Sequence, residues 1–152
     1  MNNTVPLDFY RHHKYFRHII DMTLNHPNKD DLLAIHAAVL VSGNSIIAMG
    51  SNKPKSNGLV RRYAPHDRMT IHAEVDCILK ARKKHNLQGA TIYVGRKLKK
   101  EDIFSMSKPC ETCNTILQKY GVRHVYYTNA FGGVEYLDSS DLYYKDLDWS
   151  KK

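Results

Sequence analysis

The sequence predicts one α/β domain built on a mixed β-sheet. Two short apolar runs joined by a Ser-Gly-Asn-Ser turn, residues 42–45, predict a β-hairpin. Two later strands each follow a helical segment, which favours parallel pairing there and helices on the faces of the sheet. Only residues 129–133 separate the last two predicted strands. A connection this short requires the final strand to run antiparallel to the strand before it.

The individual elements are predicted from the spacing of their apolar residues and from the signals at their ends. The helices are expected over residues 8–25, 71–84 and 111–120, with Pro27 beyond the first and Gly121 at the end of the third. The five strands are expected over residues 35–41, 46–50, 90–95, 124–128 and 134–137. An alternative is that the chain leaves the sheet after residue 133 and that residues 138–147 form a short terminal helix. Residues 51–70 form a long predicted loop, and such loops in compact domains are often functional.

The composition fits a single globular domain over residues 1–152. Hydrophobic residues make up 42% of the chain and charged residues 25%, which is an ordinary balance for such a domain. No apolar run approaches the ~20 residues of a membrane span, and the first residues lack the apolar core of a secretory signal. Three cysteines do not make a disulfide framework, so we expect a reducing cytoplasm.

The chain is basic, with a formal net charge of +8. Most of the excess lies between Lys53 and Lys108, whereas the segment from Glu135 to Asp148 is acidic. A basic body suggests an anionic partner, either a phosphorylated small molecule or a nucleic acid. A charged surface without any such target explains the charge equally well.

Two of the three cysteines, Cys110 and Cys113, lie three residues apart. This spacing is typical of a metal-binding pair or a redox pair. A catalytic zinc needs one more protein ligand and an open position for water, and the best candidate is His72, which Glu74 follows two residues later. Both motifs lie at predicted helix starts, where the helix dipole favours thiolates. Two alternatives stay open: a thioredoxin-like redox pair, and a closed structural zinc with Cys77 as its fourth ligand.

The segments HAE, residues 72–74, and PCETC, residues 109–113, together resemble the zinc signature of the cytidine and deoxycytidylate deaminase superfamily. The similarity runs from about residue 35 to residue 128. It implies a three-layer α/β/α fold with a five-stranded mixed sheet and one zinc ion per chain. The implied zinc ligands are His72, Cys110 and Cys113, and the implied proton-transfer residue is Glu74. The implied substrate-binding residues are Asn52, Ala73, Ser107 and Lys108, the last two through a backbone carbonyl that faces the exocyclic amine.

The resemblance implies hydrolytic deamination of cytosine to uracil, but the substrate signals conflict. Glu111, Asn114 and Thr115 stand where free-cytidine deaminases usually carry other residues, and the turn over residues 50–53 departs from the deoxycytidylate pattern. The expected antiparallel last strand is typical of free-nucleoside enzymes, whereas the basic segment 53–68 favours a phosphorylated substrate.

We therefore expect a free pyrimidine nucleoside or nucleotide as the substrate. The second choice is a polynucleotide, with Tyr126 or Tyr127 stacking on a flipped-out base. Relatives commonly form oligomers, so we also expect a homo-oligomer.

Overall fold

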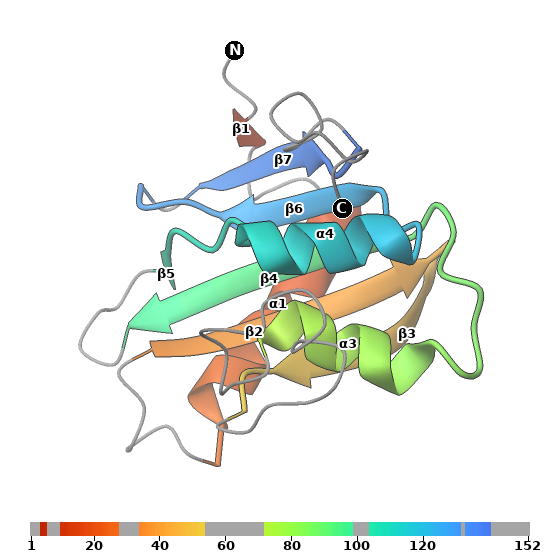
Figure 1. The fold of residues 1–152 in the computed structure, drawn as a ribbon. Helices are drawn as coiled ribbons and strands as arrows, with labels where there is room; N and C mark the ends of the chain where they lie inside the picture. Colours follow the sequence, from red (N-terminus) through yellow and green to blue (C-terminus); the bar gives the residue numbers. More distant parts are fainter. Residues whose placement is uncertain are drawn as a thin grey trace.

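The computed structural model describes residues 4–5, 10–27, 34–53, 72–98, 104–131 and 133–140 (Figure 1). Its helices are α1 (Tyr10–Leu24), α3 (Ala73–Ala81) and α4 (Glu111–Lys119). Its strands are β1 (Thr4–Val5), β2 (Ala34–Ser42), β3 (Ser45–Ser51), β4 (Thr91–Leu98), β5 (Phe104–Ser105), β6 (His124–Thr128) and β7 (Val134–Asp138). All three predicted helices and all five predicted strands are present within a few residues of their expected bounds.

The strands form one mixed sheet in the order β1-β7-β6-β4-β2-β3, with β5 paired to β4 off this path. Strand β4 pairs parallel with β6, and β6 pairs antiparallel with β7. The predicted antiparallel ending is therefore confirmed. The alternative terminal helix falls mostly on residues that lie outside the described part of the chain.

Two details of the predicted sheet were wrong. The expected count of five strands omits β1 and β5, which have two residues each and are too short to show any periodicity. The expected parallel pairing of the second and third strands is also absent, because β2 lies between them. Strands β3 and β4 run in the same direction, but each of them pairs antiparallel with β2.

The helices cover both faces of the sheet, which confirms the three-layer α/β/α fold (Figure 1). Helices α3 and α4 pack on one face, in a core that includes Ala38 and Leu40 of β2. Helix α1 packs on the other face, against Ala37 and Val39 of the same strand. Successive residues of a strand point to opposite faces, so the even-numbered residues of β2 point towards α3 and α4.

Helix α3 lies unusually close to the sheet at Gly50 of β3. A Cβ atom added to Gly50 would lie 2.6 Å from the carbonyl oxygen of Ala73 and 2.8 Å from the amide nitrogen of Cys77. Both are backbone atoms of α3 and cannot swing away as a side chain could. Glycine at this position therefore sets the depth at which the start of α3 sits on the sheet.

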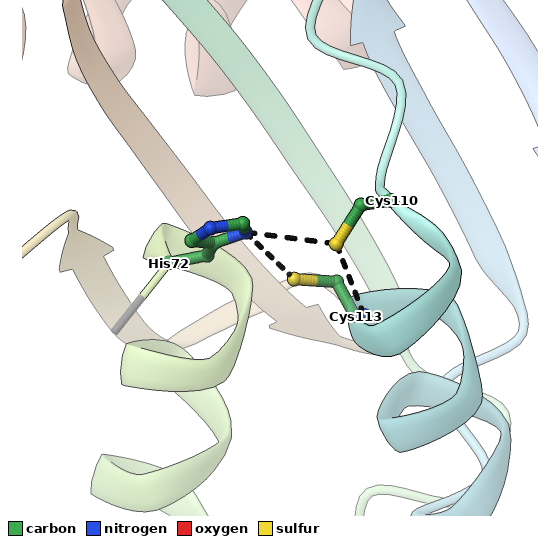
Figure 2. A group of neighbouring side chains, drawn as sticks. All are labelled: His72, Cys110 and Cys113. Atoms are coloured by element: carbon green, nitrogen blue, oxygen red, sulfur yellow. Dashed lines mark hydrogen bonds between the residues drawn. The ribbon is translucent and has the colours of Figure 1, made fainter. Parts of the chain in front are cut away.

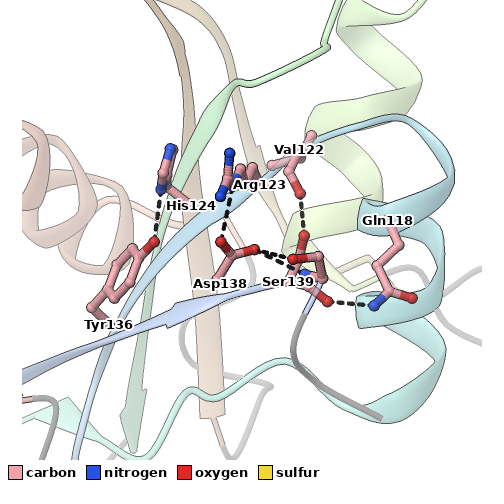
Figure 3. A network of polar contacts seen from close by, with 8 residues as sticks. Gln118, Val122, Arg123, His124, Tyr136, Asp138 and Ser139 are labelled. Carbon is pink, nitrogen blue, oxygen red and sulfur yellow. Dashed lines mark hydrogen bonds and ion pairs between the residues drawn. The ribbon is translucent and has the colours of Figure 1, made fainter. Parts of the chain in front are cut away.

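A polar network fixes the end of β7 to the C-terminal end of α4 (Figure 3). The side-chain amide of Gln118 donates to the carbonyl of Ser139, and the Ser139 hydroxyl donates to the carbonyl of Val122 at 2.6 Å. Arg123 Nε donates to Asp138 Oδ2 at 2.8 Å. This network lies at the opposite end of α4 from Cys110, so it stabilises the sheet edge without taking part in the cysteine site.

Candidate metal centre

The starts of α3 and α4 bring the predicted site residues together. His72 is the N-cap residue of α3, and Cys110 is the N-cap residue of α4. Both caps have extended backbone, with φ/ψ of −77°/160° and −68°/170° respectively. Because the two helices pack side by side on one face of the sheet, their first turns can supply ligands to a single point (Figure 1).

His72, Cys110 and Cys113 form a compact cluster of donor atoms (Figure 2). Their ligand atoms all lie within 4.8 Å of one another. His72 Nδ1 lies 3.2 Å from Cys113 Sγ and 3.7 Å from Cys110 Sγ. A nitrogen and a sulfur that share a tetrahedral zinc ion lie roughly 3.6 Å apart, from zinc bond lengths of about 2.0–2.1 Å and 2.3 Å. Two thiolates and one imidazole in this arrangement fit one zinc ion per chain and leave a fourth position open.

Hydrogen bonds from Cys113 and His72 favour the thiolate form of Cys110. The amide of Cys113 donates to Cys110 Sγ at 3.4 Å, which satisfies one of the free N–H groups of the first helical turn. The hydrogen bond from the Cys113 thiol lowers the pKa of Cys110 to about 4, assisted by His72 and opposed by burial. Metal ligands must be deprotonated, so this environment suits a zinc ligand.

Cys77 is not part of this cluster. Its side chain is fully buried in the core between α3 and the sheet, and its thiol donates to the carbonyl of Ala38 at 3.4 Å. Burial raises its pKa far above the usual range of a thiol. Cys77 therefore behaves as a small core residue, which disfavours the closed structural zinc with Cys77 as its fourth ligand.

Glu74 is buried beside the ligand cluster, with only 3% of its surface exposed. Its Oε1 atom has no hydrogen-bond partner within the described residues. Burial raises the pKa of Glu74 to about 7, against an opposing effect of His72. Burying a carboxyl oxygen without a hydrogen-bond partner lowers the stability of the fold. Such an oxygen is expected where it interacts with a reacting molecule.

The side chain of Asn52 is bound to the end of β2. Its Oδ1 accepts from the amide of His36 at 3.1 Å, and its Nδ2 donates to the carbonyl of Ala34 at 3.3 Å. These bonds fix the chain where it leaves β3. The predicted contact of Asn52 with a sugar or base stays a prediction.

The predicted pair Ser107 and Lys108 lies just before Cys110. The Ser107 hydroxyl donates to the carbonyl of Val94 at 2.9 Å and accepts from the amide of Thr128 at 2.8 Å. It thereby attaches the cysteine segment to the middle of β4 and to the end of β6. Lys108 is exposed, and Ala73, the first residue of α3, is fully buried. Their expected substrate contacts also stay predictions.

Most of the predicted basic segment lies outside the described residues, but Lys53 is included. Its Nζ lies 3.0 Å from Asp76 Oδ1, and Lys80 Nζ lies 3.1 Å from Asp76 Oδ2. The Asp76 side chain is only 5% exposed. Lys53 is thus bound to an acidic residue of α3.

Two residues that were not predicted from the sequence lie near the site: His36 contacts a candidate ligand, and Arg96 pairs with His36. The ring of His36 stacks on that of His72, with centroids 6.2 Å apart. Burial, the charge of Arg96 and the nearby His72 lower the pKa of His36 to about 4. Arg96 of β4 is the register partner of His36. Alternation along β2 places His36 on the same face as Ala38 and Leu40. A histidine in line with these apolar residues was the sign in the sequence that His36 could belong to the site.

The sequence profile of the "Cytidine and deoxycytidylate deaminase zinc-binding region" matches residues 10–129 of this chain. The chain belongs to this deaminase family. The matched range contains all three candidate zinc ligands and Glu74. Family membership therefore supports a zinc-dependent deaminase, and it leaves the substrate within that class open.

Several solved structures of deaminases are similar to this chain. The dCMP deaminase of cyanophage S-TIM5 in apo form is 24% identical, with a TM-score of 0.44, over 63% of this chain and 67% of that one. A diaminohydroxyphosphoribosylaminopyrimidine deaminase/5-amino-6-(5-phosphoribosylamino)uracil reductase from Thermotoga maritima is 22% identical, with a TM-score of 0.48, over 78% of this chain and 29% of that one. A tRNA:A34 deaminase is 21% identical, with a TM-score of 0.47, over 76% of this chain and 74% of that one.

This chain thus spans less than a third of the Thermotoga protein's length. No curated protein sequence matches it significantly. Within the described residues, no helix is both long enough and apolar enough to cross a membrane.

Proposed function

We propose that this chain is a hydrolytic deaminase that converts cytosine to uracil in a free nucleoside or nucleotide and releases ammonia. The observation that carries this proposal is the position of Glu74. It is a buried carboxyl beside the three-ligand cluster, and its Oε1 has no partner within the described residues. A purely structural zinc site has no use for such a group.

The reaction replaces the exocyclic amine of the base with the oxygen of a water molecule. Zinc, when bound, supplies a polarised water that is nucleophilic near neutral pH. The Glu74 carboxylate accepts a proton from the attacking water, and the same carboxyl then donates it towards the departing amine. A buried carboxyl suits both steps, because burial raises its pKa towards the working pH, where a general acid–base group works best.

The packing of two tyrosines bears on the polynucleotide alternative. The ring of Tyr126 stacks on Tyr93 with centroids 5.1 Å apart, on the face covered by α1. Tyr127 is 5% exposed and belongs to the core beneath α3 and α4. Both rings pack against other residues of the fold, so their expected stacking on a flipped-out base gains no support. We therefore keep a free nucleoside or nucleotide as the proposed substrate.

The proposal is tested with a substrate panel on purified zinc-loaded protein. Ammonia release is measured for cytidine, deoxycytidine, CMP, dCMP, adenosine, guanine and a cytosine-containing single-stranded oligonucleotide. We expect turnover of at least one free cytosine nucleoside or nucleotide. We expect Glu74→Gln to retain zinc and to lose at least ~10²-fold in turnover, the lower end for a general acid–base residue.

The matched control is Glu111→Gln, in the first turn of α4. This variant makes the same chemical change at an exposed position next to the zinc ligands, and it should keep its activity. Absence of ammonia release from every cytosine compound would overturn the proposal. So would a Glu74→Gln variant as active as the Glu111→Gln control.

A further inference from the structure

Arg96 is a half-buried cation on the side of the sheet that faces the metal centre. Along β4, Ile92 and Val94 belong to the core beneath α3 and α4. Arg96 continues this alternation and points to the same face. Its neighbour Gly95 points the other way, since a Cβ added there would lie 2.6 Å from Ile19 of α1.

Arg96 is also close to the ligands. It is the register partner of His36 across the β2–β4 ladder, and the His36 ring stacks on His72. The side chain of Arg96 therefore lies on the same face of the sheet as the metal centre, one strand away from the residue whose ring stacks on the candidate ligand His72.

Within the described residues, the guanidinium of Arg96 has no acidic partner and no hydrogen-bond acceptor. Among these residues, Arg96 forms hydrogen bonds with the hydroxyls of Thr128 and Ser105 through its backbone. Lys53 differs from Arg96, because Asp76 already neutralises it. A partly buried guanidinium is normally paired, and its planar fork of donors matches the oxygens of a phosphate.

We propose that Arg96 binds the phosphate of the substrate, and that the preferred substrate is therefore a nucleoside monophosphate. This inference rests on the proposed function, because it concerns the same site. A single guanidinium that has no partner among the described residues, on the face of the metal centre, matches one phosphate group. A polynucleotide would require a row of such cations, and Lys53, the described residue of the basic segment 53–68, is bound to Asp76.

The test compares the wild type, Arg96→Gln and the matched control Lys97→Gln. Lys97 is the adjacent residue, has similar exposure and points to the α1 face, so its substitution removes one positive charge without touching the site. Arg96→Gln should lower kcat/KM for the monophosphate by about 10- to 100-fold, mainly through KM, the size expected for loss of a charge-assisted hydrogen bond. It should change kcat/KM for the nucleoside by less than about 2-fold, and Arg96→Lys should recover part of the loss. Lys97→Gln should match the wild type on both substrates.

A binding measurement keeps this inference separate from the proposed function. Calorimetry with dUMP and deoxyuridine should give a wild-type preference of about 10- to 100-fold for dUMP, and the preference should disappear in Arg96→Gln. If the cytosine panel shows turnover but dUMP and deoxyuridine bind equally well, the assignment of Arg96 is overturned and the deaminase stands. If dUMP is preferred through Arg96 but no cytosine compound is deaminated, the proposed function fails and the phosphate site stands. Turnover confined to the oligonucleotide, with log kcat/KM falling steeply with log salt, also overturns the monophosphate assignment.

Discussion

Replacement of Ser107 by alanine should destabilise the fold far more than a surface serine substitution would. The Ser107 hydroxyl donates to the carbonyl of Val94 and accepts from the amide of Thr128. Thr128 Oγ1 cannot compensate for the loss, because it donates to the carbonyl of Ser105 at 2.7 Å. Ser107 and Thr128 are 3% and 4% exposed, so water does not readily replace the missing hydroxyl.

The magnitude follows from these partners. An N–H group left buried without an acceptor costs about 1–3 kcal/mol, and one lost hydrogen bond adds about 1 kcal/mol. Ser107→Ala should therefore lower the free energy of unfolding by roughly 2–4 kcal/mol, which most domains of this kind survive. Ser105→Ala is the matched control, because its half-buried hydroxyl makes one long bond, of 3.3 Å, to the carbonyl of Arg96. We expect that control to lose less than about 1 kcal/mol.

The assay is urea unfolding of both variants and the wild type with zinc at saturation, together with the zinc content of each protein. Because Ser107 lies three residues before Cys110, its substitution should also weaken zinc retention during dialysis against a chelator. A Ser107→Ala variant as stable as Ser105→Ala would refute this reasoning. It would mean that the serine hydroxyl is not what attaches the cysteine segment to β4 and β6.

Three further outcomes are expected. Metal analysis should find one zinc per chain in the wild type and in Cys77→Ala but not in Cys110→Ala; loss of zinc from Cys77→Ala would contradict the ligand assignment. Gly50→Ala should lower the free energy of unfolding, measured with heat or urea, by about 1–3 kcal/mol, because the added methyl group pushes α3 off the sheet. An unchanged stability would contradict the close approach. Burial alone would raise the pKa of Asp138, but hydrogen bonds from Arg123 and Ser140 lower it to about 2. Its contribution is therefore present above about pH 4 and lost as the pH falls towards 2, so Asp138→Asn should reduce acid stability at pH 4–5 and converge with the wild type near pH 2.

The metal centre was predictable because each half of it is local in the sequence. His72 and Glu74 lie two residues apart, and Cys110 and Cys113 lie three apart, each pair at a helix start. Short-range spacing and end signals are what a single sequence carries best. The helices, the five longer strands and the antiparallel last strand were accessible for the same reason.

The features that the sequence did not reveal depend on register between distant strands. His36 and Arg96 meet because β2 pairs with β4, and no local pattern specifies that pairing. The position of β2 between β3 and β4 is likewise a consequence of packing the whole sheet. The role of the Asn52 side chain at the end of β2 also depends on that neighbour, since its partners lie 16 and 18 residues away.

The candidate metal ligands also join two distant parts of the chain. His72 and Cys113 are 41 residues apart, and the loop between them contains β4 and β5. A bound ion therefore acts as a cross-link, much as a disulfide does. For a loop of this length the chain-entropy relation gives about 4 kcal/mol of stabilisation through restriction of the unfolded chain. The entropy of loop closure grows only with the logarithm of loop length, by roughly 0.6 kcal/mol for each doubling of the loop. Inserting a few residues between β4 and β5 should therefore change this contribution by only about a few tenths of a kcal/mol. Zinc in this protein would thus hold the fold together as well as serve the chemistry.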